Sequence, residues 1–162
     1  MRIGVVSDTH NNLKNVRKIV DIFNGAGLDR IVHTGDITQP KTLDLFAHLD
    51  APMVGVYGNN DIGERHGLAL RAEQHGFELL DPPFELVWAD RRIIVVHDPL
   101  ELEGHLRDDH HLVLHGHTHR YRLEQDGDQL TFNPGECAGH MSGLNAVGVV
   151  DLTTMTTELL KF

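Results

Sequence analysis

Two short histidine-containing segments have the composition of metal-binding sites. Gly116-His117-Thr118-His119 follows the apolar run of residues 111–115, and Asp8-Thr9-His10 follows residues 3–7. Side chains at positions i and i+2 of an extended segment point to the same side, so a strand that ends in such a pair can offer two ligands to one ion. Since imidazole and carboxylate are common metal ligands, each segment predicts a metal clamp.

Three further donors stand between these segments. Asp36, Asn59 and His97 each occur at or just after the end of another apolar run, and the first two follow a glycine. Taken alone, a Gly-Asp, Gly-Asn or Asp-x-His sequence is more often an ordinary turn than a ligand pair. Donors at five predicted strand ends of one chain instead predict one shared polynuclear site.

One hypothesis divides the donors between two ions that share Asp36. The first ion would be held by Asp8, His10, Asp36 and His119, and the second by Asp36, Asn59, His97 and His117. Because Asn59 is a neutral ligand, two divalent ions with two carboxylates and a bridging hydroxide keep a positive charge. Such a site would attract a phosphate ester even in an acidic protein.

Paired ions suit hydrolysis at phosphorus. Two ions about 3.5–4 Å apart lower the pKa of a bridging water and stabilise the attacking and leaving oxygens of an in-line displacement. Imidazole and carboxylate ligands without a thiolate favour manganese, iron, nickel, cobalt or zinc over a cysteine-rich zinc site. We therefore expect two divalent ions, with manganese as the first choice.

Composition excludes several function classes. The chain has 162 residues, which fits a single domain over residues 1–162, and its net charge of -10 disfavours binding to duplex nucleic acid. The sequence contains no apolar stretch of the roughly 18 residues that a membrane helix needs, and no signal-peptide pattern. The single cysteine, Cys137, cannot form an internal disulfide and is expected to be buried near the site. We expect a cytoplasmic protein that does not bind a membrane.

The chain contains 13 histidines, and most of them are not expected to be ligands. His33 and His115 precede donor segments and are expected to be buried residues that support the ligands. Solvated or supporting roles are expected for the histidines in polar or helical contexts, namely His48, His66, His75, His105, His110 and His140.

The first half of the chain predicts a βαβαβ arrangement. Strands are expected at residues 2–7, 30–34 and 53–57, with helices from residue 13 to about 23 and from Pro40 to about 49. Such a pattern favours parallel strands with ligands at their carboxyl ends. Asp61-Ile62-Gly63-Glu64 has the form of a capping box and predicts a third helix, starting at Asp61 and extending through Ala72.

The second half is rich in hairpins. Residues 84–88 pair with 93–96, residues 120–124 pair with 129–132 around Asp126-Gly127, and residues 146–152 pair with 158–162. A short helix over residues 100–106 and a strand over 111–115 lie between the first two pairs. The two halves therefore predict two sheets with helices outside them and the site where their strand ends meet.

With these residues in view, the chain resembles the calcineurin-like metallophosphoesterases, most closely their small bacterial and archaeal phosphodiesterase branch. The resemblance covers essentially the whole chain. It rests on Asp8-Thr9-His10-Asn11, Gly35-Asp36, Gly58-Asn59-Asn60-Asp61, His97, Gly116-His117-Thr118-His119 and the loop Asn133-Pro134-Gly135-Glu136-Cys137. It implies an α/β fold, a four-layer α/β/β/α sandwich with two mixed sheets, the two-metal ligand set given above, and an oligomer.

Four positions need separate interpretation. Phosphomonoesterases of the family usually carry a histidine proton donor directly after the asparagine ligand, where this chain has Asn60. Asp98 replaces a common glycine and Glu136 a common serine. Surface or loop-stabilising roles are expected for both, with contact to the substrate as the alternative. Asp61 is expected to cap a helix.

These observations predict a phosphodiesterase of small or end-accessible phosphodiesters, with a bridging hydroxide as the nucleophile. His10 and Asn59 would stabilise the developing charge with the ions, and Asp36 would bridge them. Two alternatives are a nuclease acting on nucleic acid ends and a protein-interaction scaffold, because the eukaryotic retromer subunit of this fold resembles the same branch.

Overall fold

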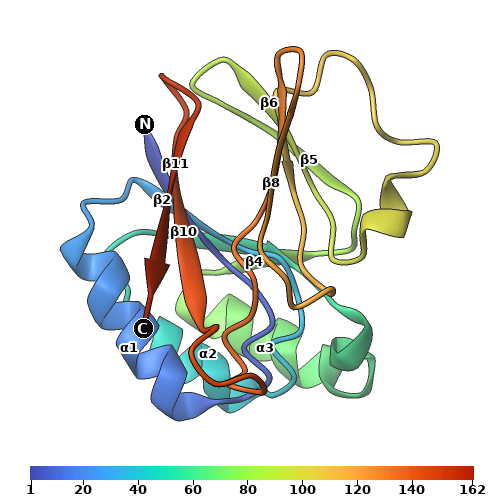
Figure 1. The fold of residues 1–162 in the computed structure, drawn as a ribbon. Coiled ribbons are helices and arrows are strands. Elements are labelled where there is room, and N and C mark those ends of the chain that lie inside the picture. Colours follow the sequence, from blue (N-terminus) through green and yellow to red (C-terminus); the bar gives the residue numbers. More distant parts are fainter.

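The computed structural model describes all 162 residues and contains two stacked β-sheets (Figure 1). The strand order is β11-β10-β1-β2-β3-β4 in the first sheet and β5-β6-β7-β9-β8 in the second. Strands β1 to β4 are parallel, β10 runs antiparallel to β1, and β11 runs antiparallel to β10. In the second sheet β6, β7 and β9 are parallel, and β5 and β8 are antiparallel to them. The predicted α/β fold with two mixed sheets is confirmed.

The elements follow the predicted order closely. The first half contains β1 (Arg2–Val6), α1 (Leu13–Gly25), β2 (Arg30–His33), α2 (Pro40–Phe46), β3 (Met53–Val56), the 3₁₀ helix η1 (Asn59–Glu64), α3 (Arg65–His75) and β4 (Glu78–Leu80). The second half contains β5 (Phe84–Trp88), β6 (Arg91–Val95), the 3₁₀ helix η2 (Pro99–Leu102), β7 (Leu112–Leu114), β8 (Arg122–Asp126), β9 (Gln129–Asn133), β10 (Ala146–Asp151) and β11 (Thr156–Lys161).

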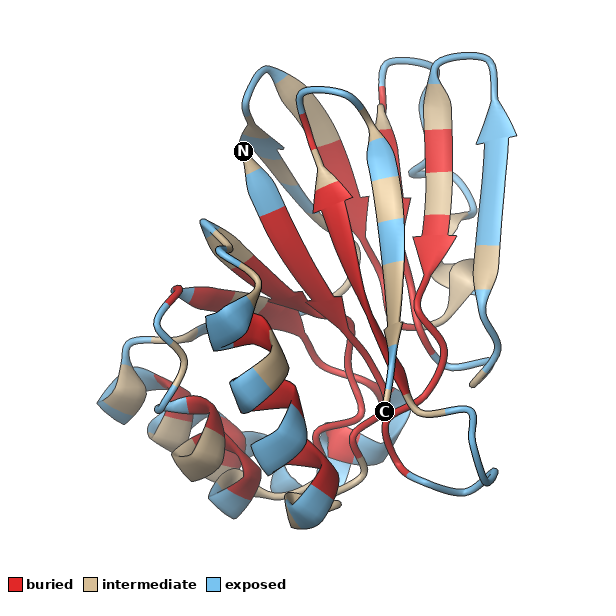
Figure 2. Cartoon of the chain, turned by 60° about the vertical axis from the view of Figure 1, so that its left-hand side comes forward, coloured by how far each residue is buried: buried red, intermediate tan, exposed pale blue.

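Two apolar cores hold the layers together. Between the sheets, Ile3 and Val5 of β1 belong to the same buried cluster as Leu112, Leu114 and Phe132 of the second sheet. On the other face of the first sheet, Val6 packs in a cluster with the buried side of α1. Figure 2 shows this pattern: central strands of the sheets are buried, and the helices are buried only on their inner sides. The alternation along β1 therefore supplies both cores.

Three elements differ from the prediction. Strand β4 was not predicted, because three residues are too few to show an alternating pattern. The helix expected from Asp61 begins instead at Arg65, after η1. The helix expected over residues 100–106 is reduced to η2.

The two sheets are covered by different amounts of helix. All three α-helices lie against the first sheet, and η2 with its neighbouring loop lies beside the second sheet (Figure 1). The structure contains no helix of the length and apolar character needed to cross a membrane.

Candidate metal centre

The seven predicted donor residues come from loops at the same end of both sheets. In the first sheet, Asp8 and His10 follow β1, Asp36 follows β2 and Asn59 follows β3. In the second sheet, His97 follows β6, and His117 and His119 follow β7. The donors therefore converge where the two sheets meet, although they are spread over more than a hundred positions of the sequence.

The two histidine-containing segments do not continue their strands. Strand β1 ends at Val6 and β7 at Leu114, and the φ angles are positive at Asp8 (51°), His10 (42°), His117 (65°) and His119 (57°). The expectation of extended i, i+2 pairs was therefore wrong. Left-handed backbone costs a non-glycine residue about 1–2 kcal/mol, and such strain concentrates at functional sites. Asp36, with φ 59°, shares this property.

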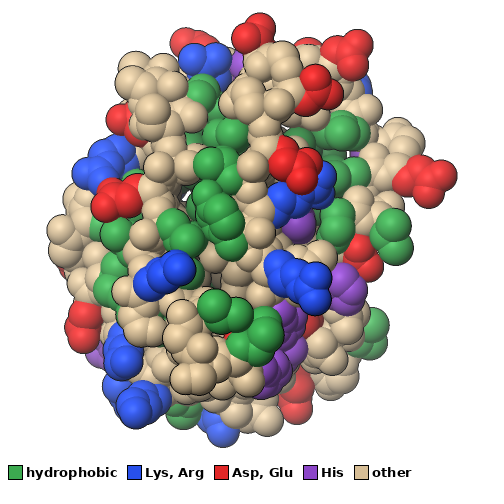
Figure 3. Space-filling model, in the orientation of Figure 1, with side chains coloured by type: hydrophobic (Ala, Val, Ile, Leu, Met, Phe, Trp, Pro, Cys, Tyr) green, Lys and Arg blue, Asp and Glu red, His purple; other side chains and the backbone are tan.

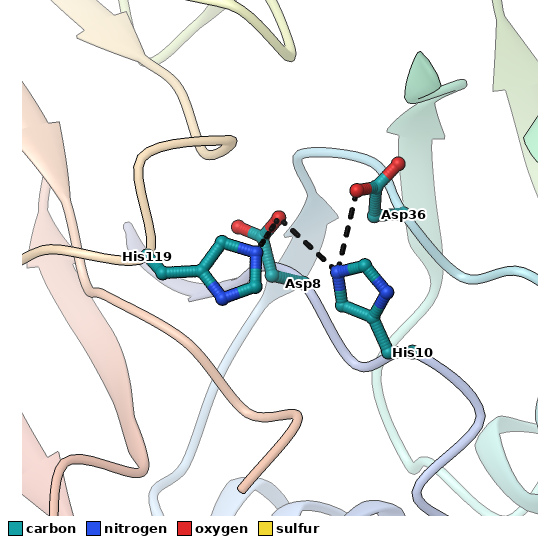
Figure 4. A group of neighbouring side chains, drawn as sticks. All are labelled: Asp8, His10, Asp36 and His119. Carbon is teal, nitrogen blue, oxygen red and sulfur yellow. Dashed lines mark ion pairs between the residues drawn. The ribbon is translucent and has the colours of Figure 1, made fainter. Parts of the chain in front are cut away.

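Four donors form one close group, drawn in Figure 4. His10 Nε2 lies 3.3 Å from Asp36 Oδ2 and 3.8 Å from Asp8 Oδ1. His119 Nε2 lies 3.4 Å from the same Asp8 oxygen. Atoms bound to one ion at about 2.1 Å lie roughly 3–4 Å apart, so this spacing suits a cation. Asp8 Oδ1 and His10 Nε2 are buried without a hydrogen-bond partner, as expected for atoms whose partner is a metal.

The remaining donors form a second group beside it. His97 Nε2 lies 2.9 Å from Asn59 Oδ1 and 3.4 Å from Asp36 Oδ2. His117 Nδ1 lies 3.1 Å from the same Asn59 oxygen. Since Asp36 Oδ2 faces His10 on one side and His97 on the other, it is placed as a bridging carboxylate oxygen would be. The residues present thus fit divalent ions.

Asp61 holds the loops that carry Asp36 and Asn59. Its carboxylate is buried and accepts backbone N–H bonds from Gly58 at 2.7 Å, Thr38 at 2.6 Å and Asp36 at 3.0 Å. Asp61 was expected to cap the third helix, but the N-cap of α3 is Glu64. Asp61 instead caps η1 through the Gly58 N–H, and its carboxylate also joins the two loops of the site. Asn60 adds two bonds to the Asp36 carboxylate, from its side-chain amide at 2.7 Å and its backbone N–H at 2.9 Å.

Glu136 orients His119. Its side chain is fully buried and accepts a bond from His119 Nδ1 at 3.0 Å and another from the backbone N–H of Met141 at 2.8 Å. Of the surface or loop-stabilising roles expected for Glu136, the surface role is wrong, while the bond from Met141 does stabilise the loop. The bond from His119 Nδ1 leaves Nε2 of His119 facing Asp8, an arrangement typical of metal-binding histidines. His97 is fixed in the same way by its Nδ1, which donates to the Thr34 carbonyl at 2.8 Å.

Asp98 and the supporting histidines are placed largely as predicted. Asp98 accepts a bond from the backbone N–H of Leu100 and stabilises the loop at η2. His33 and His115 are buried, and burial lowers the pKa of His33 to about 4, so this ring is neutral. His110 is buried too and is not the solvated residue that was expected.

His140, for which a solvated or supporting role was expected, lies beside the first donor group. Its ring stacks on His119 with an interplanar angle of 8° and lies 5.2 Å from the His10 ring. It belongs to the loop between β9 and β10, and 59% of its side chain is exposed. His140 therefore borders the first donor group from the solvent side.

Asp36 and His97 shift each other's pKa. Burial raises the pKa of Asp36, but contacts with His97 and Asn60 outweigh burial and hold this pKa well below its usual range. Burial lowers the pKa of His97, but the contact with Asp36 and the charges of Asp36 and Asp8 raise it to about 9.

Gly116 allows the two histidine-containing segments to approach each other. A Cβ atom at this position would overlap the Ser7 hydroxyl and lie 2.8 Å from Asp8 Oδ2. We expect Gly116→Ala to displace His117 and His119 and to weaken metal binding by about 10–100-fold, the usual effect of disturbed ligand support. Metal titration with calorimetry measures this loss. Gly25→Ala is the matched control, because no atom lies within 4 Å of its added Cβ. Equal metal affinity in both variants would contradict the packing argument.

Comparison with known proteins decides the family. Residues 1–155 match the sequence model of the calcineurin-like phosphoesterase superfamily domain. The chain belongs to the calcineurin-like phosphoesterase superfamily. This phosphoesterase is 34% identical over 158 residues to a phosphodiesterase of Methanocaldococcus jannaschii, and the alignment covers 93% of each chain. The solved structure of an archaeal phosphodiesterase has a TM-score of 0.90, 30% identity and full coverage of both chains.

More distant structures share the fold of this phosphoesterase. A phosphoesterase from E. coli has a TM-score of 0.72 at 19% identity, with 99% of this chain and 98% of the other covered. Vps29 from Entamoeba histolytica, complexed with zinc, has a TM-score of 0.66 at 17% identity, with 100% and 98% covered. The predicted family and enzyme class are confirmed: the protein is a metallophosphoesterase, and its family implies divalent metal ions.

Proposed function

We propose that the protein is a phosphodiesterase that uses two divalent ions, with manganese preferred, to hydrolyse small phosphodiesters. The observation that carries this proposal is the pair of donor groups sharing Asp36 Oδ2, with Asp8 Oδ1 and His10 Nε2 left unpartnered. Asp8, His10, Asp36 and His119 would hold one ion, and Asp36, Asn59, His97 and His117 the other. When bound, the ions supply Lewis acidity and lower the pKa of water at the site.

The chain's own residues orient and stabilise the reacting phosphate. The oxygen of water bonds to phosphorus while one ester P–O bond breaks, which yields a phosphate monoester and an alcohol. Asn59 is exposed and His10 partly exposed beside the donor groups, so both can face a phosphoryl oxygen as negative charge develops on it. Asp36 belongs to both donor groups and therefore fixes their positions relative to each other.

Asn60 favours substrates whose leaving alcohol is acidic over substrates whose leaving alcohol needs a proton. Its amide is bonded to Asp36, and an amide cannot donate a proton to a leaving oxygen at neutral pH. Alcohols that leave readily as anions need no such proton. Asn59, His117 and Thr118 are all exposed at the site, so the phosphorus of a short or terminal ester can approach it.

Asn60→His is expected to raise phosphomonoesterase activity. The imidazole would supply the missing proton donor, and general acid catalysis contributes about 10²–10⁴-fold in rate. The measurement is kcat/KM for phenyl phosphate, whose leaving group is weakly acidic, at equal metal content. Asn60→Ala serves as the control, since it also removes the side-chain bond to Asp36 but adds no donor. If both variants had the same monoesterase activity, this account of Asn60 would be wrong.

A metal-dependent assay tests the proposed function. The full chain loaded with manganese should hydrolyse bis-p-nitrophenyl phosphate faster than p-nitrophenyl phosphate. A chelator should abolish both reactions, and manganese, nickel, cobalt or zinc should restore them. A loaded protein that is inert toward a panel of phosphodiesters would instead support a scaffold role. The seven donor positions, all occupied by metal-binding residue types, favour the enzyme.

A further inference from the structure

Two hollows flank the proposed metal centre, and their linings carry opposite charge. The first, called here the acidic hollow, starts at His97 and Asn59 and contains four carboxylates: Asp61, Asp81, Asp98 and Glu101. Its one cation, Arg65, is paired with Asp81. The second, called the cationic hollow, starts at His119 and contains Arg120 and Lys161 with no carboxylate in its lining.

The two cations of the cationic hollow are free to bind an anion. Arg120 and Lys161 are exposed, and neither has a carboxylate oxygen within 4.0 Å. In a protein of net charge -10, two unpaired cations beside the metal centre are an exception to the overall charge. Figure 3 shows blue, green and purple side chains adjoining on the face that carries β10 and β11. The local field of this hollow therefore favours a negatively charged group.

The other walls of the cationic hollow suit a flat ring. Tyr121 is 51% exposed, and its ring is held by an edge contact with Phe132, with centroids 6.3 Å apart. Leu144, Ala146 and Leu159 supply apolar surface around it. The volume is about 190 Å³, below the roughly 300–1,000 Å³ of pockets that enclose a whole drug-sized ligand. The hollow thus accommodates one substituent of a diester rather than the complete substrate.

We propose that the cationic hollow binds a ring-bearing substituent that carries an anionic group of its own, as a nucleotide does. This inference rests on the proposed function, because it assumes that the scissile phosphorus lies at the metal centre. Tyr121 and Leu144 contact the ring, and Arg120 and Lys161 bind the additional anionic group. The acidic hollow then receives the uncharged substituent, since its carboxylates repel an anion. The substrate class is therefore a small nucleotide-like diester with a second phosphate on one side.

A matched pair of dinucleotides tests the assignment. The manganese-loaded full chain should have a lower KM for pApA, which carries a 5′-phosphate, than for ApA, which lacks it. Lys161→Ala and Arg120→Ala should each reduce this preference by about three- to fivefold, the effect of one exposed charge pair. Tyr121→Ala should raise KM for both dinucleotides. Arg17→Ala is the control, because it removes an equal charge from an exposed position of α1 outside the hollow and should keep the preference.

Binding without metal separates this inference from the proposed function. Calorimetry on the chelator-treated full chain should show tighter binding of AMP than of adenosine, and Lys161→Ala should reduce the difference. Equal affinity for AMP and adenosine, or an unchanged preference in both the Lys161 and Arg120 variants, overturns the inference. If AMP is preferred but neither bis-p-nitrophenyl phosphate nor the dinucleotides are hydrolysed, the hollow's ligand class stands and the proposed phosphodiesterase function fails.

Discussion

Asp36→Asn should lower kcat/KM for bis-p-nitrophenyl phosphate by about 10³-fold or more. Asp36 Oδ2 lies 3.3 Å from His10 Nε2 and 3.4 Å from His97 Nε2, so this one oxygen serves both donor groups. The amide has a similar size but loses the negative charge and one of the two acceptor oxygens. Loss of ion binding removes several kcal/mol of transition-state stabilisation, and each 1.36 kcal/mol corresponds to about tenfold in rate.

The measurement combines initial rates with metal analysis of the same sample. Asp44→Asn is the matched control. Asp44 has a lowered pKa through its contacts with His75 and Arg71, but it lies on α2 and its side chain is 40% exposed. The control should keep its metal and its rate. An Asp36 variant that retained metal and lost less than tenfold in rate would exclude a bridging role.

Removal of the metal should abolish activity and lower the melting temperature by about 8–16 °C. The side chains of Asp8 and Asp36 are 0% and 2% exposed, so without an ion their charges are balanced only by histidines. A ligand present at about 1,000 times its Kd stabilises the folded state by about 4 kcal/mol. For a domain of this size, 1 kcal/mol corresponds to about 2–4 °C.

Scanning calorimetry of the chelated and reloaded protein measures this effect. Manganese should restore both the melting temperature and the activity. The Asp36→Asn variant should show a much smaller shift on chelation, since it has less metal to lose. A chelated wild-type protein that keeps its melting temperature and its activity would show that no ion takes part in either.

The sequence predicts the larger elements because their patterns are local. Helix α1 buries Val16, Ile19, Val20 and Phe23, which recur at helical spacing, and the hairpins have recognisable turns. The short elements depend instead on distant contacts. Strand β4 exists through its pairing with β3, and η1 through the Asp61 carboxylate that accepts bonds from two loops. The residue pattern within each of these two segments does not predict β4 or η1.

The donor positions could be predicted for a similar reason, since each is a separate signal at the end of an apolar run. Their geometry could not, because the left-handed backbone at Asp8 and His119 results from the loops that meet there. The contacts of Glu136 and His140 with His119 were not predicted either. Each contacts His119, which lies well before it in the sequence. Nothing in the segment around residues 136–140 indicates that contact.

The divided origin of the donors has a mechanical consequence. Four donors belong to loops of one sheet and three to loops of the other, and the sheets are otherwise joined mainly by a dry apolar layer. A cation bound by donors of both sets would link the two sheets at the edge of that layer. The affinity for the ion therefore depends on how stably the two sheets pack against each other. A cavity opened in this layer by Phe132→Ala would therefore weaken ion binding as well.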